Sequence, residues 1–283
     1  MNILIIGMCG NSLFYSKETN TLLNEEPGGK GYNQAVGIAK LGGKVSFLGA
    51  IGNENHGVMC SEYLNKIGVN NLLITKNKKT TYATIHVDQF GNNEINVVFG
   101  CELDESDLDY IKMQIDKHDL IMFQNEINQE LNIKLLKYAH DKSKYILINP
   151  APCAKWLSNY LELINLITPN EHEARVLFSI PDSVLTMEIG KYLSNIKYNN
   201  VLVTLGDKGS VFIQKDKYQY FPSLKVKAVD TTGAGDLMNA CLAYGIQKGF
   251  SFSKSINLGT KACAYSVSRR YVLGSYPTLN DLD

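Results

Sequence analysis

A run of small residues beside an acid stands at 230–236 (DTTGAGD), and a helical run at 237–243 follows it. Small residues before a helix let consecutive backbone N–H groups point into one concavity, where the helix dipole adds partial positive charge. Gly233, Ala234 and Gly235 would form such an anion hole, which suits the γ-phosphate of a nucleotide during transfer. Asp236 could then accept the proton of an attacking hydroxyl. Taken alone, the pattern is equally well explained by a tight turn with a helix-capping acid.

A second glycine-rich segment, PGGKGYNQA at 27–35, also precedes a helical stretch. It is not a Walker A loop, and no Gly-x-Gly-x-x-Gly fingerprint follows the first predicted strand. Close glycines let a ligand approach the backbone, and Lys30 and Asn33 supply donors suited to the oxygens of a polyol. A flexible turn with a solvated lysine explains this segment equally well when it is taken alone.

The elements that must position these two segments alternate between strands and helices over most of the chain. The predicted strands, rich in Ile, Val and Leu, cover 2–6, 45–51, 120–124, 145–149, 163–168 and 201–205. The predicted helices cover 33–41, 57–67, 129–140, 171–178, 187–196 and 252–268. This alternation predicts right-handed βαβ units, and therefore an α/β fold with a mostly parallel central sheet between helices.

The stretch 81–99 breaks the alternation. Its β-rich segments, 81–87 and 94–99, are joined by a turn-forming cluster at 88–93, which predicts a β-hairpin. A hairpin inserted into a parallel α/β domain could form part of a flap over one edge of the sheet. We therefore predict a single domain over 1–283, with a small β lid formed by about 11–27 and 80–100.

Composition narrows the class of protein. Lys plus Arg and Asp plus Glu both number 28, so the formal net charge of zero gives no sign of nucleic-acid binding. The six cysteines form no Cys-x-x-Cys pair, which indicates buried thiols in a reducing compartment. The apolar start of the chain lacks a basic n-region and is far too short to span a membrane. We expect a cytoplasmic protein that binds neither nucleic acid nor membrane.

Together, the two glycine segments resemble the two signatures of the ribokinase family, also called the PfkB carbohydrate kinases. GGKGYNQA at 28–35 and DTTGAGD at 230–236 stand in the order of that family. Three intermediate motifs agree with it: NPAP at 149–152, TPNEHEA at 168–174 and VTLGDKG at 203–209. The resemblance runs from about residue 1 to 277, and it implies a ribokinase-like three-layer α/β/α fold with a small β lid.

The resemblance also implies a function: transfer of the γ-phosphoryl group of Mg-ATP to a primary hydroxyl of a sugar. Asp236 resembles the catalytic base, and residues 233–235 resemble the anion hole. The residues that would contact the sugar are Gly29, Lys30, Asn33, Glu126, Asn11 and Ser12. The residues that would line the Mg-ATP side are Asn170, Thr204, Gly206, Gly209 and, toward magnesium, Glu173. Asp230, Thr232 and Ser275 fall where many relatives hold a potassium ion, and the family implies a homodimer through the lid.

The chain departs from the family pattern at three places. Ribokinases usually carry an Asn and an Asp after the first strand, but the expected acid falls on Ser12, which removes an acceptor for two vicinal sugar hydroxyls. The span between the first strand and Gly28 is short, which predicts a reduced lid. Tyr271 and Val272 replace the usual Gly-Ala beside the adenine and the cation, which predicts crowding of the base or a weaker dependence on potassium.

Three alternatives stay open at this point. The missing acid leaves room for a nucleoside kinase of the pseudouridine type. A vitamin-precursor kinase can share the anion hole but would not be expected to keep the 28–35 signature. A catalytically weak sugar- or nucleotide-binding protein on the same fold would be expected to lose the base or the anion hole first, and both are intact here.

Overall fold

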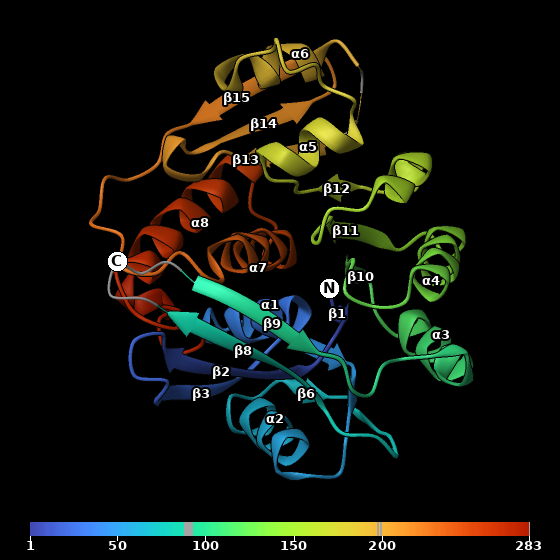
Figure 1. The fold of residues 1–283 in the computed structure, drawn as a ribbon. Coiled ribbons are helices and arrows are strands. Elements are labelled where there is room, and N and C mark those ends of the chain that lie inside the picture. The colour runs from blue at the N-terminus through green and yellow to red at the C-terminus, as the bar shows by residue number, and fades with distance from the viewer. Residues whose placement is uncertain (88–92, 197, 199, 283) are drawn as a thin grey trace.

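The computed structural model describes residues 1–87, 93–196, 198 and 200–282, with the backbone alone at Val87, Asn93 and Ile95. Within this part of the chain, nine strands form a large sheet and four form a small sheet (Figure 1). A further short pair joins β5 (Ala50–Ile51) to β7 (Ile74–Thr75).

The large sheet is mostly parallel. Its order is β15 (Lys217–Phe221), β14 (Ser210–Gln214), β13 (Asn200–Thr204), β12 (Leu166–Ile167), β11 (Tyr145–Asn149), β10 (Leu120–Gln124), β1 (Ile3–Ile6), β4 (Val45–Leu48) and β6 (Asn70–Asn71). Neighbours from β13 to β6 pair in parallel, whereas β14 pairs antiparallel with both β13 and β15. Because the parallel strands share one direction, their carboxyl ends meet at one edge of the sheet.

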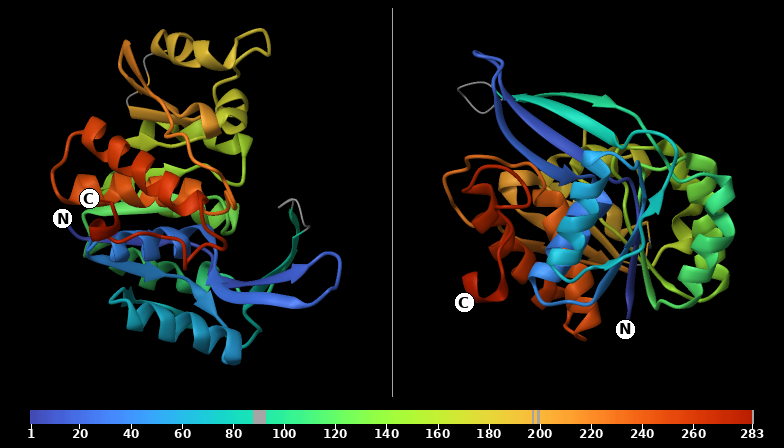
Figure 2. Two further views of the ribbon diagram at one scale, coloured as in Figure 1. Left: turned by 90° about the vertical axis from the view of Figure 1, so that its left-hand side faces the viewer. Right: turned by 90° about the horizontal axis from the view of Figure 1, so that it is seen from below.

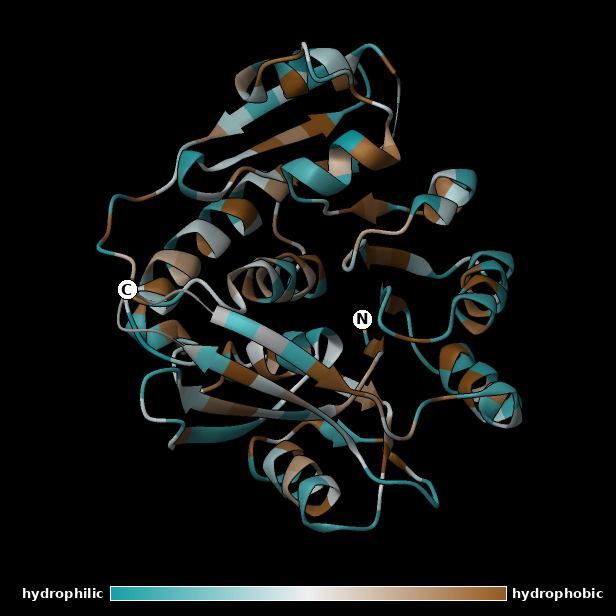
Figure 3. Cartoon of the chain, in the orientation of Figure 1, coloured by the Kyte–Doolittle hydropathy of each residue, from teal (hydrophilic) through white to brown (hydrophobic). Residues whose placement is uncertain are grey.

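Helices cover both faces of this sheet, because successive side chains of a strand point to opposite faces. Ile3 and Ile5 of β1 belong to one buried cluster, and Leu4 and Ile6 belong to the other. The first cluster is completed by α1 (Lys30–Lys40), α2 (Asn55–Lys66), α7 (Ala234–Gln247) and α8 (Phe252–Val267). The second is completed by α3 (Leu108–Asp116), α4 (Gln129–Asp141), α5 (Glu171–Leu177) and α6 (Ile189–Ser194). Figure 3 shows the hydrophobic colouring concentrated in strands β10 to β12.

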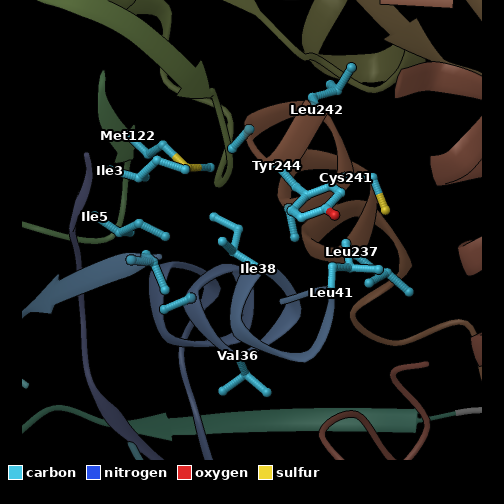
Figure 4. Close-up of a cluster of buried hydrophobic side chains, with 14 of the residues drawn as sticks. Ile3, Ile5, Val36, Ile38, Leu41, Met122, Leu237, Cys241, Leu242 and Tyr244 are labelled. Carbon is cyan, nitrogen blue, oxygen red and sulfur yellow. The ribbon is translucent and has the colours of Figure 1, made fainter. Parts of the chain in front are cut away.

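The close packing of α1 against α7 brings the two glycine-rich segments together, since each helix begins at one of them. Figure 4 shows Ile38 and Leu41 of α1 facing Leu237 and Tyr244 of α7. A Cβ atom added at Gly37 would lie 2.6 Å from the Cβ of Ala240, so the helix backbones approach more closely than side chains at both positions would allow.

The small sheet has the order β3 (Leu22–Gly28), β2 (Gly10–Ser16), β8 (Thr81–Val87) and β9 (Asn93–Val98), and it projects from one side of the body (Figure 2). The short span before Gly28 forms two seven-residue strands, so it contributes a complete hairpin to this sheet. Ser12 lies directly across from Glu26, which places both side chains on one face. Of the turn predicted at 88–93, residues 88–92 lie outside the described residues.

Several predicted elements differ from the structure. The predicted strand 45–51 is divided into β4 and β5 at Gly49, where an added Cβ would lie 2.9 Å from the carbonyl oxygen of Gly7. The predicted strand 163–168 shortens to β12 because 155–163 forms 3-10 turns, and the predicted helix 187–196 is a 3-10 turn followed by α6. The antiparallel pair β14–β15 and helix α3 were not predicted. No helix in the described part of the chain is long and apolar enough to cross a membrane.

Replacing Gly37 by Ala should separate α1 from α7 and lower the free energy of unfolding by about 1–3 kcal/mol, in spite of the higher helix propensity of alanine. Urea unfolding of the purified variant measures this change. Gly274→Ala is the matched control, because no heavy atom lies within 4 Å of a Cβ at that exposed position. A Gly37→Ala variant as stable as the control would contradict the packing described here.

Candidate active site

The candidate site lies at the carboxyl edge of the parallel strands. Gln124, Asn149 and Thr204 are the last residues of β10, β11 and β13, and α1 and α7 begin beside them. Open α/β sheets bind ligands at this edge because loops and helix N-termini converge there.

The anion turn, Gly233–Gly235, forms the start of α7. Gly233 is the N-cap residue and has φ 76°, a left-handed conformation that favours glycine. A Cβ on Gly235 would meet no atom within 4 Å, so the backbone is open to a ligand there. Ala234 and Gly235 line a pocket of about 580 Å³. Ala234 N–H donates to Thr231 O at 3.3 Å, so an anion would be bound mainly by the other N–H groups of this helix terminus.

Asp236 lies beside the turn and is only 7% exposed. Its carboxylate accepts hydrogen bonds from Asn33 Nδ2 at 3.0 Å and from Gln34 Nε2 at 3.2 Å, both from α1. Burial raises the pKa of Asp236, whereas the Lys30 charge and these two bonds act in the opposite direction. A raised pKa makes a carboxylate a better proton acceptor near neutral pH.

The start of α1 depends on a glycine and carries a charged residue. Gly29 has φ 110°, and a Cβ added there would lie 2.4 Å from Met8 O. The backbone N–H of Lys30 donates to Glu126 Oε2 at 2.7 Å. Burial lowers the pKa of the Lys30 ammonium, but Asp236, Glu126 and Glu173 raise it by more. Lys30 is therefore a cation held among three carboxyl groups.

Asn33 has an unused hydrogen-bonding atom at this place. Its Nδ2 donates to Asp236, but its buried Oδ1 has no partner within the described part of the chain. Buried polar atoms are nearly always paired, so this oxygen is available to accept a hydrogen bond from a ligand hydroxyl.

A buried amide network supports Asp236, and the sequence motifs did not single it out. Gln34 Nε2 also donates to Asn149 Oδ1 at 3.2 Å, and Gln124 Nε2 donates to Gln34 Oε1 at 2.8 Å. These contacts join α1 to the ends of β10 and β11 and fix the amide of Gln34 toward Asp236. Gln34 and Asn149 stand within the motifs at 28–35 and 149–152, but those motifs did not show that the two side chains meet beside Asp236.

The 580 Å³ pocket extends from the anion turn along α8 and the loop 223–228. Thr204, Gly206 and Gly209 line it as well. Gly206 has φ 62° and Gly209 has φ 103°, so the loop after β13 depends on glycine at both places. Three of the residues predicted for the nucleotide side, Thr204, Gly206 and Gly209, therefore lie beside the anion turn.

Asn170 and Glu173 stand at the start of α5 and bond reciprocally as a capping box. Asn170 Oδ1 accepts from Glu173 N–H at 2.8 Å, and Glu173 Oε2 accepts from Asn170 N–H at 2.8 Å. Burial raises the pKa of Glu173, opposed by the Asn170 N–H and by Lys30. One carboxylate oxygen of Glu173 is left outside this box.

The remaining predicted residues are distributed over different parts of the site. Ser12 shares a face of the small sheet with Glu26, whereas the Asn11 side chain lies against Cys60 and the His56 carbonyl of α2. Asp230, Thr232 and Ser275 are grouped around the loop 271–276. Asp230 accepts from Thr232 N–H at 2.9 Å and from Tyr271 N–H at 3.1 Å, and the Ser275 hydroxyl lies 2.6 Å from that of Ser266.

Comparison with known proteins gives concordant matches. The pattern of the pfkB family carbohydrate kinases matches residues 3–279. The ribokinase of Lactococcus lactis is 34% identical over 263 residues, covering 90% of this chain and 84% of that protein. The deoxyribokinase of Salmonella typhimurium is 30% identical over 264 residues, covering 90% and 86%. The solved structure of Arabidopsis thaliana ribokinase complexed with ribose and ATP superposes with a TM-score of 0.84 at 25% identity, covering 99% of this chain and 96% of that chain.

Glu126 should make stability depend on pH. Burial raises its pKa from 4.5 to about 7, although Lys30 opposes the shift. Below pH 4.5 the folded and unfolded chains are both protonated at Glu126, whereas above about pH 7 the folded chain holds a disfavoured carboxylate. Glu126→Gln should therefore raise the free energy of unfolding by about 1–3 kcal/mol at pH 8 and leave it unchanged near pH 4.5.

Urea unfolding at both pH values measures this difference. Glu130→Gln, at an exposed position on α4, controls for the loss of one negative charge. An equal effect of Glu126→Gln at both pH values would contradict a buried, raised carboxyl group.

Proposed function

Because the chain belongs to the pfkB family of carbohydrate kinases, we propose that its site transfers the γ-phosphoryl group of ATP to the primary hydroxyl of a pentose related to ribose. The observation that carries this proposal is the buried Asp236 carboxylate, fixed by Asn33 and Gln34 beside the open anion turn at the end of the 580 Å³ pocket. A sugar hydroxyl bound next to Asp236 would lie between this carboxylate and a γ-phosphate bound at the anion turn.

In the proposed reaction, Asp236 accepts the proton of the attacking hydroxyl as its oxygen bonds to phosphorus and the bond to the ADP oxygen breaks. The N–H groups of the anion turn stabilise the charge on the equatorial oxygens. Lys30 and the free Asn33 Oδ1 hold the sugar hydroxyls, and the amide network keeps the Asp236 carboxylate in one orientation. Most of the catalysis comes from positioning, with no covalent enzyme intermediate.

The residues near Glu173 fit a magnesium ion bound mainly through nucleotide phosphates. Magnesium usually keeps several waters and takes one or two carboxylates, and Glu173 has one oxygen outside the capping box. Among the described residues no group of three or more His, Cys, Asp or Glu forms a complete protein site. When bound, the ion would neutralise charge on the phosphates, and the Glu173 oxygen outside the capping box would hold it.

The residues near Asp230 do not fit a potassium ion in this conformation. Its carboxylate accepts backbone N–H bonds from Thr232 and Tyr271, and the Ser275 hydroxyl is engaged by Ser266 and Val272 O. Potassium therefore takes no part in the proposed reaction.

For the small sheet we propose a homodimer contact, supported by the exposed apolar side chains of Leu22, Leu23 and Val98.

The sugar site lacks one acceptor that ribokinases usually carry. Ser12 stands at the position of the expected acid, and the neighbouring Glu26 cannot replace it, because both of its oxygens accept backbone N–H bonds. A carboxylate bonded to two vicinal hydroxyls would lose a partner with a 2-deoxy sugar. Its absence, together with the similarity to a deoxyribokinase, supports 2-deoxyribose as a second candidate substrate.

Asp236→Asn should reduce kcat with ribose or 2-deoxyribose by about a hundredfold or more, because the amide cannot accept the proton. ADP release in the presence of Mg-ATP and a panel of pentoses, hexoses and nucleosides measures it. Asp141→Asn, at the end of α4, is the control and should keep full turnover. Absence of turnover in the unaltered protein with every member of the panel would overturn the proposed function.

The ratio of kcat/KM for ribose to that for 2-deoxyribose should lie within about tenfold, because no buried carboxylate at position 12 is left unpaired by the 2-deoxy sugar. Initial rates at limiting sugar concentration give this ratio directly. A preference for ribose of more than about a hundredfold would show that another group of the protein hydrogen-bonds the 2-hydroxyl.

A further inference from the structure

The loop 271–276 packs against the anion turn at Gly233 and occupies the space that a side chain on this residue would need. A Cβ at Gly233 would lie 2.5 Å from Val272 Cγ1 and 2.7 Å from the Tyr276 hydroxyl. That hydroxyl donates to the Gly233 carbonyl oxygen at 2.7 Å, and Tyr276 is only 3% exposed. The same carbonyl accepts the first hydrogen bond of α7, from Leu237 N–H at 2.9 Å. The loop therefore fixes the peptide from which the anion turn starts.

The small sheet holds this loop through one buried acid. Glu26 of β3 is 8% exposed, and its two carboxylate oxygens accept from Val272 N–H at 2.8 Å and from Leu273 N–H at 3.3 Å. Only two residues separate Glu26 from Gly29, where the sugar-binding segment begins. The strand β3 is therefore joined both to the loop and to the start of α1.

The end of α1 holds the other side of the loop. Lys40 Nζ donates to the carbonyl oxygens of Leu273 at 2.6 Å and Tyr276 at 3.0 Å. With its N–H groups on Glu26 and its carbonyls on Lys40, the loop has few alternative conformations. Its position then depends on β3 and α1 together.

We propose that the loop 271–276 couples the small sheet to the anion turn, with Glu26 and Tyr276 as positioning residues for phosphoryl transfer. Neither side chain touches the reacting atoms; Glu26 fixes the loop and Tyr276 fixes Gly233. Closure of the small sheet over a sugar would thereby order the N–H groups that stabilise the transferred phosphoryl group. This inference rests on the proposed function, which supplies the role of the anion turn.

A double-mutant cycle tests the coupling. Tyr276→Phe and Glu26→Ala should each lower kcat by about five- to tenfold, the effect of losing a buried hydrogen bond, while KM for sugar and ATP changes less than twofold. The double variant should lose no more than about tenfold, because both act through one loop, whereas independent effects would multiply to about 25- to 100-fold. Glu26→Gln, which keeps one acceptor oxygen, should restore most of the turnover lost in Glu26→Ala.

Tyr138→Phe is the control, since it removes a phenol bond to Asp116 between α4 and α3, in the helical layer on the other face of the large sheet. Its kcat should equal that of the unaltered protein. Multiplicative losses in the double variant, or a Tyr276→Phe variant as active as this control, would overturn the coupling.

Amide hydrogen exchange gives a second measurement that does not require turnover. Glu26→Ala should speed exchange in the segment 231–240 even though Glu26 lies in the small sheet, outside this segment, and Tyr138→Phe should not. If the unaltered protein is inactive on every sugar but this exchange effect is present, the proposed function fails and the coupling stands. If the protein is active and exchange in 231–240 is unchanged in Glu26→Ala, the coupling fails alone.

Discussion

The site depends on one buried carboxylate that is held by neutral amides. Asp236 is enclosed by protein, and its hydrogen bonds come from Asn33 and Gln34 of a helix about two hundred positions earlier in the chain. Because the Asp236 carboxylate is buried and has no cation among the described residues in direct contact, its affinity for a proton stays high. The two amide donors fix the orientation of the carboxylate. The close approach of α1 and α7 is what permits these bonds. The packing around Gly37 therefore helps to hold the Asp236 carboxylate in place.

The charges around Asp236 are arranged so that no carboxyl group is isolated from a cation. Lys30 lies among Asp236, Glu126 and Glu173, and it favours the ionised form of each. Burial acts in the opposite direction on all three acids, most clearly on Glu126. The balance raises the pKa of all three acids, that of Glu126 to about 7, and a raised pKa suits a carboxylate that must accept a proton.

Much of this arrangement could be predicted from the sequence, and the limits have physical causes. Buried parallel strands such as β10 and β11 are continuous apolar runs, so their bounds were predicted correctly. The strand β15 is exposed along most of its length and carries no such signal. The glycine motifs indicated where α1 and α7 begin, but the predicted starts at 33 and 237 lie three residues after the observed ones at Lys30 and Ala234. Glu26 and Tyr276 gave no signal, because a single acid or tyrosine acquires its role only from residues that the fold brings beside it.

The length of helix α1 is constrained because residues at both of its ends make contacts on which the site depends. Lys30 at its start faces the site, and Lys40 at its end holds the loop 271–276. An α-helix turns by about 100° per residue, so one inserted residue would rotate one lysine away from its partners while the other stayed in place. The segment from Lys30 to Lys40 should therefore keep its length during evolution, in addition to the residue types at Asn33, Gln34 and Gly37. The exposed turn between β2 and β3 is under no such restriction, and differences in chain length among relatives are expected to accumulate there.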